Sequence, residues 1–384
     1  MTKTKTILIV SGEDSGDKHA AELVRSLKKH GDFRFFGATG QRMRDEGVES
    51  VVHSDDFGIF GIIEVAKSVP MFLGVMKKLV AAAESNKPDL VVLVDFPEFN
   101  LKLAKRLKKK GFKIVYYISP QLWAWRSYRV TTIDRYVDRL LTILPFEKEW
   151  YASRGVTHVS YVGHPLAGVV NPTQPKSEFL EAQGIHEGSR VIALLPGSRR
   201  KEIERNFPEM VKGVRLLNDR IGSVDFIVAL ARSRSADEVK KVISHEWPEG
   251  TSKFRIVRDK TCDVLNAADV AVVASGTATL ETALIGTPQV IVYKTSGLNY
   301  AMFKQIVPIR QFGLANLIAG EPVFKELIQN DFTADSLCEE LVRLLEPETN
   351  QRLRKSAAKI SDLLGSKNAT ENASLEIAAI LDPH

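Results

Sequence analysis

The sequence contains very little cysteine. Its 384 residues include only two, Cys262 and Cys338, which lie far apart and form no Cys-x-x-Cys pair. The spacing therefore predicts neither a zinc site nor a disulfide framework, and it favours a reducing, cytoplasmic setting. No low-complexity tract interrupts the chain, so we expect every segment to belong to a folded body. We expect the protein to use no metal and no cofactor.

Long apolar runs are also missing. No stretch approaches the roughly 18 to 20 apolar residues that are needed to cross a bilayer. Near the amino terminus only four apolar residues, 7–10, follow the lysines, whereas a signal peptide needs an apolar region of about 7 to 15. We therefore predict a first strand there, and a chain that does not span a membrane but can still lie on one.

The charge is moderately basic, with a formal net charge of +6 and a pI near 9.1. Such a balance suits an anionic partner, for example a phospholipid surface, a sugar phosphate or nucleic acid. Ordinary solubility explains the same balance. No block of lysine and arginine is interleaved with aromatic residues, so we do not expect nucleic-acid binding.

Two sets of short β-branched runs alternate with helix-length segments. The first set lies at 6–10, 34–36, 90–95, 113–118 and 140–143, and the second at 191–195, 225–230, 254–257, 270–274 and 289–293. Continuous apolar strands of this kind indicate parallel sheets that are covered on both faces. A proline-rich polar stretch, 171–178, separates the two sets and is typical of a domain linker.

The sequence therefore predicts an α/β protein with two Rossmann-like, doubly wound domains. We place the amino-terminal domain at 1–170 and the carboxy-terminal domain at 171–346, and we expect the final helices, about 347–384, to return and complete the first domain. Open parallel sheets bind ligands beyond the carboxyl ends of their strands. Two such sheets therefore predict a site in a cleft that the domains face.

The loop after the first predicted strand, 11–17, reads Ser-Gly-Glu-Asp-Ser-Gly-Asp and leads into a helix. Its carboxylates would repel a phosphate, so we expect Glu13, Ser15, Gly16 and Asp17 to contact the hydroxyls or an amine of an acceptor. Helix capping explains Ser15 and Asp17 equally well.

Two glycine turns in the second half are typical of a diphosphate site. Each follows a predicted strand and precedes a helix, where backbone amides, and at the first turn a guanidinium, can bind phosphate oxygens. A glutamate on the second of these helices can accept hydrogen bonds from ribose hydroxyls. The residues expected to bind a nucleoside diphosphate are Gly197, Ser198, Arg199, Ser275, Gly276, Thr277 and Glu281. A solvated cationic helix face is the alternative for 199–201, and neither turn matches a P-loop or a Gly-x-Gly-x-x-Gly fingerprint.

Asp95 ends an apolar strand and precedes Phe96 and Pro97. A carboxylate at this end of a strand, beside an aromatic ring, is placed to have its proton affinity raised and to take a proton from a hydroxyl. We therefore predict that Asp95 is catalytic. Helix capping is the alternative, because Pro97 suits the first turn of a helix.

Two further features lie on the acceptor side. The segment 121–126 carries Trp123, whose ring can stack on a sugar or cover an acyl chain, and Arg126, which can bind a phosphate. Ordinary packing explains the tryptophan equally well. His164, next to the linker, can contact a ligand or act as a base, although a structural hinge histidine is the simpler interpretation.

The segment 61–83 is rich in large apolar residues but contains Pro70 and three lysines. Two short helices with an apolar face and a basic edge can lie in a lipid interface. A core helix of the first sheet is the alternative. The residues expected to face a membrane are Ile62, Ile63, Val69, Met71, Phe72, Leu73 and Met76.

The order of these motifs resembles that of the lipid-A-disaccharide synthases. The matching segments, spread from about residue 7 to 330, are SGEDSGD, a glycine-containing stretch at 37–47, FGIFGIIEV, VDFPEFN, ISPQLWAWR, LPFEK, GHPLA, LPGSRRKEI, SGTATLET and ANLIAGE. The resemblance implies the GT-B fold and an inverting transfer of 2,3-diacylglucosamine from UDP-2,3-diacylglucosamine to the 6'-hydroxyl of 2,3-diacylglucosamine 1-phosphate. The products are a β-1,6 disaccharide and UDP. The resemblance also implies an enzyme that is cytoplasmic and attached peripherally to the inner membrane.

The resemblance assigns roles to four residues: the base to Asp95, a diphosphate contact to Arg199, a ribose contact to Glu281 and a UDP contact to Asn316. Ala315, Gly168 and Gln121 stand where a proline, an aspartate and a serine are common, which leaves the fine shape of the acceptor pocket open. Two rivals use the same plan: a UDP-N-acetylglucosamine 2-epimerase, which needs no lipid, and a nucleotide-sugar sensor without a catalytic base. The sequence does not fix the oligomeric state.

Overall fold

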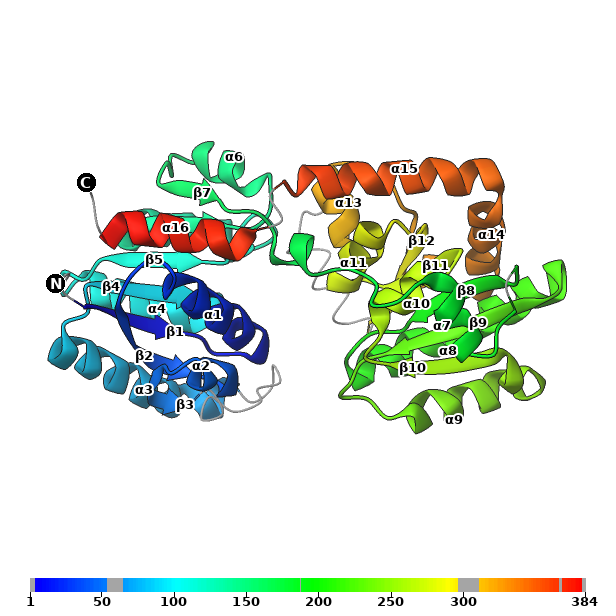
Figure 1. Ribbon diagram of the computed structural model, residues 1–384, viewed down its shortest axis with the longest axis horizontal. Coiled ribbons are helices and arrows are strands. Elements are labelled where there is room, and N and C mark those ends of the chain that lie inside the picture. Colours follow the sequence, from blue (N-terminus) through cyan, green and yellow to red (C-terminus); the bar gives the residue numbers. More distant parts are fainter. Residues whose placement is uncertain (1–3, 54–64, 187, 296–310, 366–367, 382–384) are drawn as a thin grey trace. The chain divides into compact units, whose positions relative to one another are not determined.

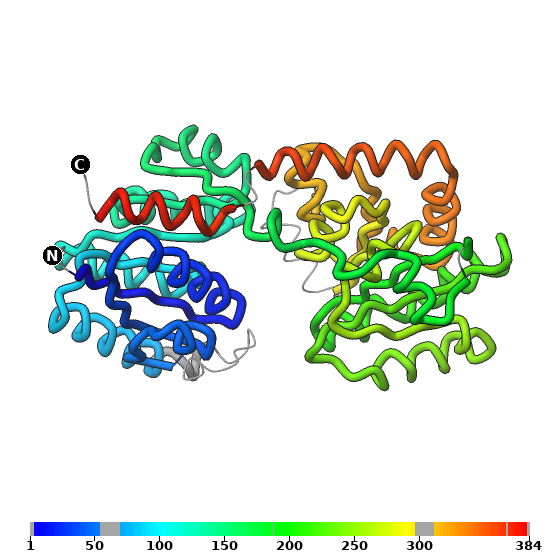
Figure 2. Tube along the Cα trace, viewed as in Figure 1, coloured from blue at the N-terminus to red at the C-terminus, as the bar shows by residue number. Residues whose placement is uncertain are grey.

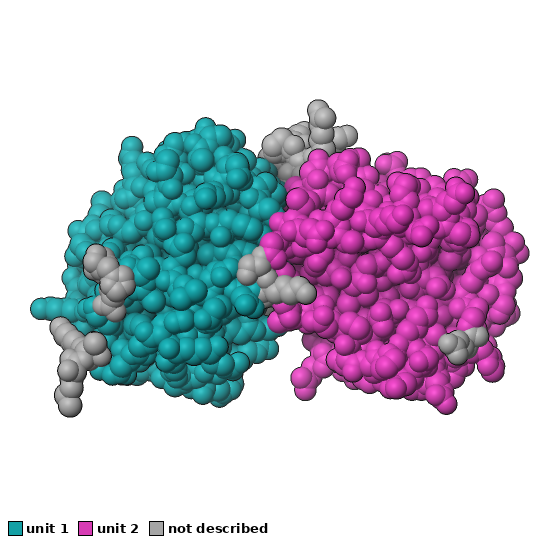
Figure 3. All heavy atoms as spheres, turned by 45° about the horizontal axis from the view of Figure 1, so that its top comes forward, with its two compact units in different colours: residues 1–165, 366–384 teal, residues 166–365 magenta. Residues whose placement is uncertain are grey.

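The computed structural model describes residues 4–53, 65–186, 188–295, 311–365 and 368–381. The chain forms two compact units, which Figure 3 colours separately: residues 1–165 with 366–384 make unit 1, and residues 166–365 make unit 2. Each unit is built on one parallel sheet with helices on both faces (Figure 1). The predicted class, two doubly wound α/β domains, is confirmed.

The sheet of unit 1 has the strand order β3-β2-β1-β4-β5-β6-β7. Its elements are β1 Lys5–Val10, α1 Asp14–Leu27, β2 Phe33–Thr39, α2 Gln41–Asp45, β3 Glu49–His53, α3 Val65–Asn86, β4 Leu90–Val94, α4 Pro97–Lys108, β5 Ile114–Tyr117, η2 Ser127–Arg129, α5 Val130–Tyr136, β6 Arg139–Thr142, α6 Glu147–Ala152, β7 Val159–Tyr161 and α16 Ala369–Leu381.

Alternate residues of β1 serve the two faces of this sheet. Leu8 and Val10 pack with residues of α3, α4 and α5, whereas Ile7 and Ile9 pack with residues of α1 and α16. All four are fully buried. A strand buried on both faces has no polar position, which is why its sequence is a continuous apolar run.

The carboxy-terminal helix α16 returns to unit 1, where it lies beside α1 (Figures 1 and 2). The Arg139 guanidinium donates to the Glu376 carboxylate at 3.0 and 2.8 Å, and the Lys5 ammonium donates to the Leu381 carbonyl at 3.1 Å. These contacts attach the end of the chain to β6 and β1. The last helix is therefore part of the first fold.

The sheet of unit 2 has the strand order β10-β9-β8-β11-β12-β13. Its elements are η3 Pro165–Gly168 at the junction, α7 Lys176–Ala182, β8 Arg190–Leu195, α8 Arg200–Ile221, β9 Val224–Leu230, α9 Ala236–Glu246, η4 Pro248–Lys253, β10 Phe254–Arg258, α10 Thr261–Ala267, β11 Val270–Ala274, α11 Thr277–Ile285, β12 Gln289–Tyr293, α13 Leu314–Ala319, β13 Glu326–Ile328, η5 Gln329–Asp331, α14 Ala334–Leu345 and α15 Pro347–Leu363.

The helix α15 belongs to unit 2, whereas we had expected all residues from about 347 onward to join the first domain. It packs on α11, α13 and α14 through the buried side chains of Leu353, Ala357 and Ile360. Asn350 and Arg354 also donate to the Asp269 carbonyl, at 3.0 and 3.3 Å. The chain therefore crosses back only after α15, and the other crossing lies at 165/166, five residues before the expected 170/171.

Candidate active site

The turn after β4 has an unusual backbone. Asp95 and Phe96 have positive φ angles of 49° and 51°, a left-handed conformation that non-glycine residues adopt at a cost in energy. Two buried side chains hold it. The Asn100 amide donates to the Val94 and Asp95 carbonyls at 3.2 and 2.8 Å, and the Tyr116 hydroxyl donates to the Asp95 carbonyl at 2.6 Å. The strain is therefore maintained by specific contacts at the carboxyl end of a central strand.

The Asp95 carboxyl is the most perturbed acid of this turn. Burial raises its pKa from 3.8 to about 6, and the nearby negative charge of Glu13 adds to the rise. A hydrogen bond from the Phe96 amide and the charge of His19 act in the opposite direction. The increase in proton affinity that the sequence predicted is confirmed. A carboxyl with a pKa near 6 is ionised at neutral pH and still accepts a proton readily.

The acidic loop after β1 lies beside this turn, because β1 and β4 are parallel neighbours. A Cβ on Gly12 would lie 2.2 Å from the Phe96 ring, so glycine is required there for the ring to pack. Gly16 is buried, and a Cβ there would lie 2.8 Å from the Ser11 hydroxyl. Glu13 and Ser15 are exposed at the start of α1. They can meet a ligand that approaches Asp95.

Asp17 differs from the role we expected on the acceptor side. Its side chain is only 2% exposed, and its oxygens accept hydrogen bonds from the backbone amides of Gly40, Arg42 and Met43 at 2.8, 2.9 and 3.3 Å. A buried carboxylate with three amide donors caps the amino terminus of α2. Asp17 therefore caps α2 and not α1, the helix into which its loop leads, so the capping alternative is also wrong for this residue.

His19 acts electrostatically on Asp95, and it also acts on a second histidine, His164. His164 is buried, and burial together with the charge of His19 lowers its pKa to about 4. It is therefore neutral at pH 7 and supplies no positive charge to a phosphate. His19 was missed by sequence reasoning, although it lies in α1 only two residues beyond the acidic loop. Its Nδ1 is buried without a hydrogen-bond partner among the described residues and lies 3.7 Å from the Glu22 carboxylate.

The aromatic loop after β5 is attached to neighbouring elements through Trp123 and Arg126. The Trp123 indole donates to the Glu147 carboxylate at 3.2 Å and packs edge-on against Phe146. The Arg126 guanidinium forms an ion pair with Glu98 and stacks on Trp125, 4.0 Å from the ring centre. Sequence reasoning missed both acids, although each lies inside a motif that it singled out.

A second arginine, Arg129, donates to both Glu98 oxygens at 2.8 and 3.0 Å. Glu98 thus joins the first turn of α4, directly after Asp95, to the end of the aromatic loop. Because one carboxylate meets two guanidinium groups, this corner retains a net positive charge. It suits an anionic group of a ligand.

In unit 2, the first glycine turn leads into α8. Gly197 has a φ of 117°, and a Cβ there would lie 2.6 Å from the Glu202 carboxylate. That carboxylate accepts from the backbone amides of Ser198 and Arg199 at 3.1 and 3.2 Å. The Arg199 side chain is 84% exposed and lies 3.4 Å from the same acid. An anionic oxygen thus already occupies the amides that we expected to bind diphosphate.

The second turn lies at the same edge of the sheet, because β8 and β11 are parallel neighbours. Gly276 and Thr277 are exposed at the start of α11, and Glu281 is half-buried one turn later. The Ser275 hydroxyl donates to the Phe312 carbonyl at 2.7 Å. These two turns and Glu281 therefore share one end of the sheet.

Asn316 has a structural role in place of the expected UDP contact. It is fully buried, and its amide donates to the Phe324 carbonyl and the Glu326 carboxylate at 2.7 and 2.9 Å, while its oxygen accepts from the Phe324 amide at 2.9 Å. A fully hydrogen-bonded buried amide fixes the chain between α13 and β13. It has no atom directed to solvent.

The residues of α3 that we expected to face a membrane differ in their exposure. Met71 and Leu73 are 36% and 43% exposed, but Met76 is only 3% exposed and lies in the core, so that assignment is wrong for Met76. Phe72 packs between the sheet and the strained turn, with ring centres 6.3 Å from Phe96 and 5.9 Å from Phe99. Ile62 and Ile63 lie outside the described residues, and of Val69 only its place in α3 is described. No helix in the described part of the chain is both long enough and apolar enough to span a bilayer.

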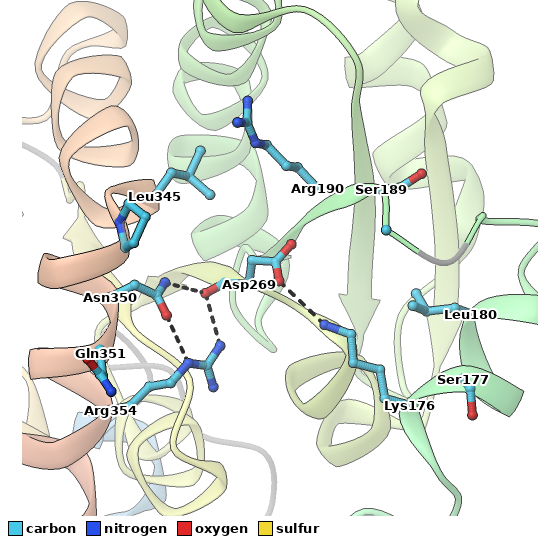
Figure 4. Close-up of a pocket in the computed structure, with 12 residues that line it drawn as sticks. Lys176, Ser177, Leu180, Ser189, Arg190, Asp269, Leu345, Asn350, Gln351 and Arg354 are labelled. Atoms are coloured by element: carbon cyan, nitrogen blue, oxygen red, sulfur yellow. Dashed lines mark hydrogen bonds and ion pairs between the residues drawn. The ribbon is translucent and has the colours of Figure 1, made fainter.

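A cavity of about 680 Å³ lies elsewhere in unit 2 (Figure 4). It is lined by α7, the start of β8, the residue before β11 and the first turns of α15, with Lys176 reaching the Asp269 carboxylate at 3.4 Å. These are the amino ends of the strands, whereas both glycine turns follow carboxyl ends. We therefore do not assign the nucleotide to this cavity.

Comparisons with known proteins agree with this geometry. The family model described as lipid-A-disaccharide synthetase matches residues 7–380. The chain is 41% identical to the lipid-A-disaccharide synthase of Syntrophus aciditrophicus, covering 97% of both chains, and 40% identical to that of Geobacter sulfurreducens, covering 95% of this chain and 94% of the relative. The synthase of Myxococcus xanthus is 38% identical over 100% of this chain and 99% of its own.

Solved structures share the fold at low identity. A putative UDP-N-acetylglucosamine 2-epimerase from Listeria monocytogenes aligns with a TM-score of 0.67 and 13% identity, covering 98% of this chain and 96% of that one. The calicheamicin glycosyltransferase CalG4 aligns with a TM-score of 0.60 and 16% identity, covering 99% of both chains. At this identity the likeness establishes the GT-B architecture alone, and it does not favour the epimerase rival.

Proposed function

The chain belongs to the lipid-A-disaccharide synthase family, which catalyses the glycosyl transfer that forms the lipid A disaccharide, and from this premise we propose how its residues perform the transfer. The proposed donor is UDP-2,3-diacylglucosamine and the proposed acceptor is 2,3-diacylglucosamine 1-phosphate. The donor binds to unit 2 and the acceptor to unit 1.

Asp95 is the general base of the proposed reaction. The observation that carries this role is the raised pKa of the Asp95 carboxyl, about 6. The carboxyl lies on a left-handed turn that Asn100 and Tyr116 hold in place. In its ionised form it takes the proton of the acceptor 6'-hydroxyl as that oxygen attacks the anomeric carbon of the donor. The pKa near 6 balances the two requirements of a base, which must be ionised before the step and protonated after it.

Bond changes follow a single displacement. A bond forms between the acceptor oxygen and the anomeric carbon, and the bond from that carbon to the UDP oxygen breaks, its electron pair leaving with UDP. Attack from the opposite face inverts the anomeric centre. Charge therefore builds on the leaving diphosphate, where hydrogen-bond donors lower the barrier.

The hydrogen bonds to the diphosphate come from the amides of the two glycine turns and from the Arg199 guanidinium. Their position at one edge of the unit 2 sheet supports this role, and so does the carboxylate of Glu202, which already uses the amides of Ser198 and Arg199 as an anion does. Glu202 must release these amides when the diphosphate contacts them. Glu281 accepts hydrogen bonds from the ribose hydroxyls.

The acceptor is proposed to lie along the loops of unit 1. Glu13 and Ser15 contact its hydroxyls, Trp123 and Trp125 border its sugar or acyl groups, and Arg126 meets its 1-phosphate. The net positive charge of the corner at Glu98 supports the last contact. We leave Asp17 and Asn316 out of the site because their side chains are fully engaged within the fold.

The enzyme is proposed to lie on the cytoplasmic face of the inner membrane, where its acylated substrates reside. The exposed Met71 and Leu73 on α3 support this, together with Lys77 and Lys78 one to two turns later on the same helix. Apolar and basic side chains side by side favour an anionic lipid surface.

The test is release of UDP from UDP-2,3-diacylglucosamine in detergent micelles, with and without the acceptor, for the wild type and Asp95→Asn. We expect acceptor-dependent release in the wild type and a loss of about 100-fold or more in the variant, with UDP affinity nearly unchanged. A glutamine in place of the exposed Glu149 is the matched control, since it also removes one carboxylate from unit 1. Acceptor-independent release, or equal losses of turnover and UDP affinity in Asp95→Asn, would contradict the proposal.

A further inference from the structure

The buried acid Glu147 has no part in the proposed chemistry, yet it is only 1% exposed. No lysine or arginine forms an ion pair with it in the described part of the chain, and its oxygens accept from neutral donors, the Trp123 indole at 3.2 Å and the Leu144 amide at 3.1 Å. Removing a carboxylate from water without a counter-charge is unfavourable, and burial accordingly raises its pKa to about 7. A hydrophobic residue in its place would leave the Trp123 indole and the Leu144 amide without this acceptor. The acid must therefore supply something that packing does not.

The two segments that Glu147 joins are the start of α6 and the loop that follows β5. Phe146, the residue before Glu147, lies edge-on to Trp123 with ring centres 5.2 Å apart. Further along α6, the Tyr151 hydroxyl lies 3.0 Å from the Ser119 hydroxyl and donates to the Pro120 carbonyl at 3.3 Å. Both ends of the segment 119–123 are thus attached to α6 by buried polar contacts.

The rest of the loop is held in part by its own backbone, because Ala124 is buried and the amides of Ala124 and Trp125 donate to the Gln121 carbonyl at 3.1 and 3.4 Å. Trp125 is 43% exposed and Tyr128 is 70% exposed. Arg126 has a positive φ of 55° and contacts Trp125 and Glu98. The way in which Trp123 is held therefore contributes to the path that the chain takes into Arg126.

We propose that Glu147 is a positioning residue for acceptor binding. By holding the Trp123 indole, it fixes the loop 119–126 and thereby the direction in which the Arg126 side chain extends from the loop. The inference rests on the proposed function, because it takes this loop to be the acceptor-binding loop. It predicts that Glu147 governs the KM for the acceptor and leaves donor binding, which involves unit 2, unaffected.

The experiment compares Glu147→Ala, Glu147→Gln and Trp123→Phe with the control Glu149→Gln, an exposed acid on the same helix. In the full-length enzyme we expect Glu147→Ala to raise the acceptor KM by about 10-fold, equivalent to about 1.4 kcal/mol, while the Kd for UDP changes by less than about 2-fold. Trp123→Phe, which keeps an aromatic ring but removes the indole N–H together with the five-membered ring, should raise the KM similarly. Glu147→Gln keeps one accepting oxygen and should restore part of the affinity.

The double variant measures whether Glu147 and Trp123 affect the acceptor KM through the same hydrogen bond, which a loss of stability alone would not show. If the two residues act through one hydrogen bond, Glu147→Ala combined with Trp123→Phe should be no worse than the more damaging single variant. Additive effects, or an equal loss of UDP affinity, overturn the proposal. The Trp123→Phe and Glu147→Gln variants keep the test valid if Glu147→Ala fails to fold.

The variant Arg126→Gln separates this proposal from the proposed function. If Arg126→Gln raises the acceptor KM while the Glu147 variants do not, Glu147 has no positioning role. The assignment of the loop 119–126 to acceptor binding still holds in that case. If all of these variants leave the acceptor KM unchanged in an enzyme that still transfers the sugar, the acceptor assignment of the loop is wrong, and the positioning role falls with it.

Discussion

Replacing Asp95 by asparagine should make the protein more stable at neutral pH and almost inactive. Burial and Glu13 raise the pKa of this carboxyl from 3.8 to about 6, and a rise of that size corresponds to about 3 kcal/mol. The pKa of Asp95 is higher in the folded state than in the unfolded state. The contribution of this carboxyl to the free energy of unfolding is therefore complete below about pH 3.8, falls as the pH rises, and is absent above about pH 6. Asparagine stays neutral and tolerates the left-handed backbone at φ 49°. The variant therefore avoids the ionisation that destabilises the wild type.

The assay is urea denaturation of both proteins from pH 4.5 to pH 8. Trp247 is the only tryptophan of unit 2, so in a Trp247→Phe background the fluorescence reports on unit 1 alone. We expect the variant to gain about 2 kcal/mol relative to the wild type between pH 4.5 and pH 6.5, and no more above pH 7. Other titrating groups are common to both proteins, so their contributions cancel. A difference that does not change with pH would refute the cause we give for the raised pKa, and retained turnover would refute the catalytic role.

Four further predictions address the remaining parts of the site. Glu202→Ala removes the carboxylate that accepts from the Ser198 and Arg199 amides, so calorimetry should show UDP binding about 10-fold tighter; weaker binding would mean that Glu202 assists the nucleotide. His19→Leu removes a charge that lowers the pKa of Asp95, so the acidic limb of the kcat/KM profile should move to higher pH; an unmoved limb would contradict this. Asn316→Ala leaves buried partners unpaired and should destabilise unit 2 by about 2 to 4 kcal/mol, measured from the fluorescence change that is lost when Trp247→Phe is added. Met71→Ser with Leu73→Ser should lower binding to anionic vesicles roughly 10-fold at unchanged stability; unchanged flotation would remove α3 from the membrane surface.

The sequence was sufficient for the parts of the fold that depend on local periodicity. Continuous apolar runs marked the parallel strands, and the turns after them lie where parallel topology brings them together. The same periodicity also contained a signal that we did not use: Phe72, Val75, Met76 and Leu79 follow helical spacing, and they form the inward face of α3. The assignment of Met76 to the membrane surface was therefore avoidable.

Other assignments depended on distant partners that a single sequence does not reveal. Asp17 follows an acidic loop in the sequence, but its role is set by the start of α2, more than twenty residues later. Asn316 lies in a motif associated with UDP, but the folded chain uses it to hold Phe324 and Glu326. A polar residue in a motif can bind the ligand or support the residues that do. Only the location of its partners separates the two cases.

The charges of unit 1 also favour one orientation of the proposed acceptor. Asp95 and Glu13 are mutually repulsive carboxyls, so a phosphate placed beside the base would be repelled and would raise the pKa of Asp95 further. Arg126 and Arg129 form the nearest cationic corner along this segment, and Glu98 neutralises only one of them. The proposed acceptor carries its phosphate on carbon 1 and its reacting hydroxyl on carbon 6, which is attached to the ring carbon on the other side of the ring oxygen. A sugar with its phosphate at the arginines can thus present its hydroxyl to Asp95, whereas the reversed orientation brings the phosphate to two acids and leaves the arginines without an anion.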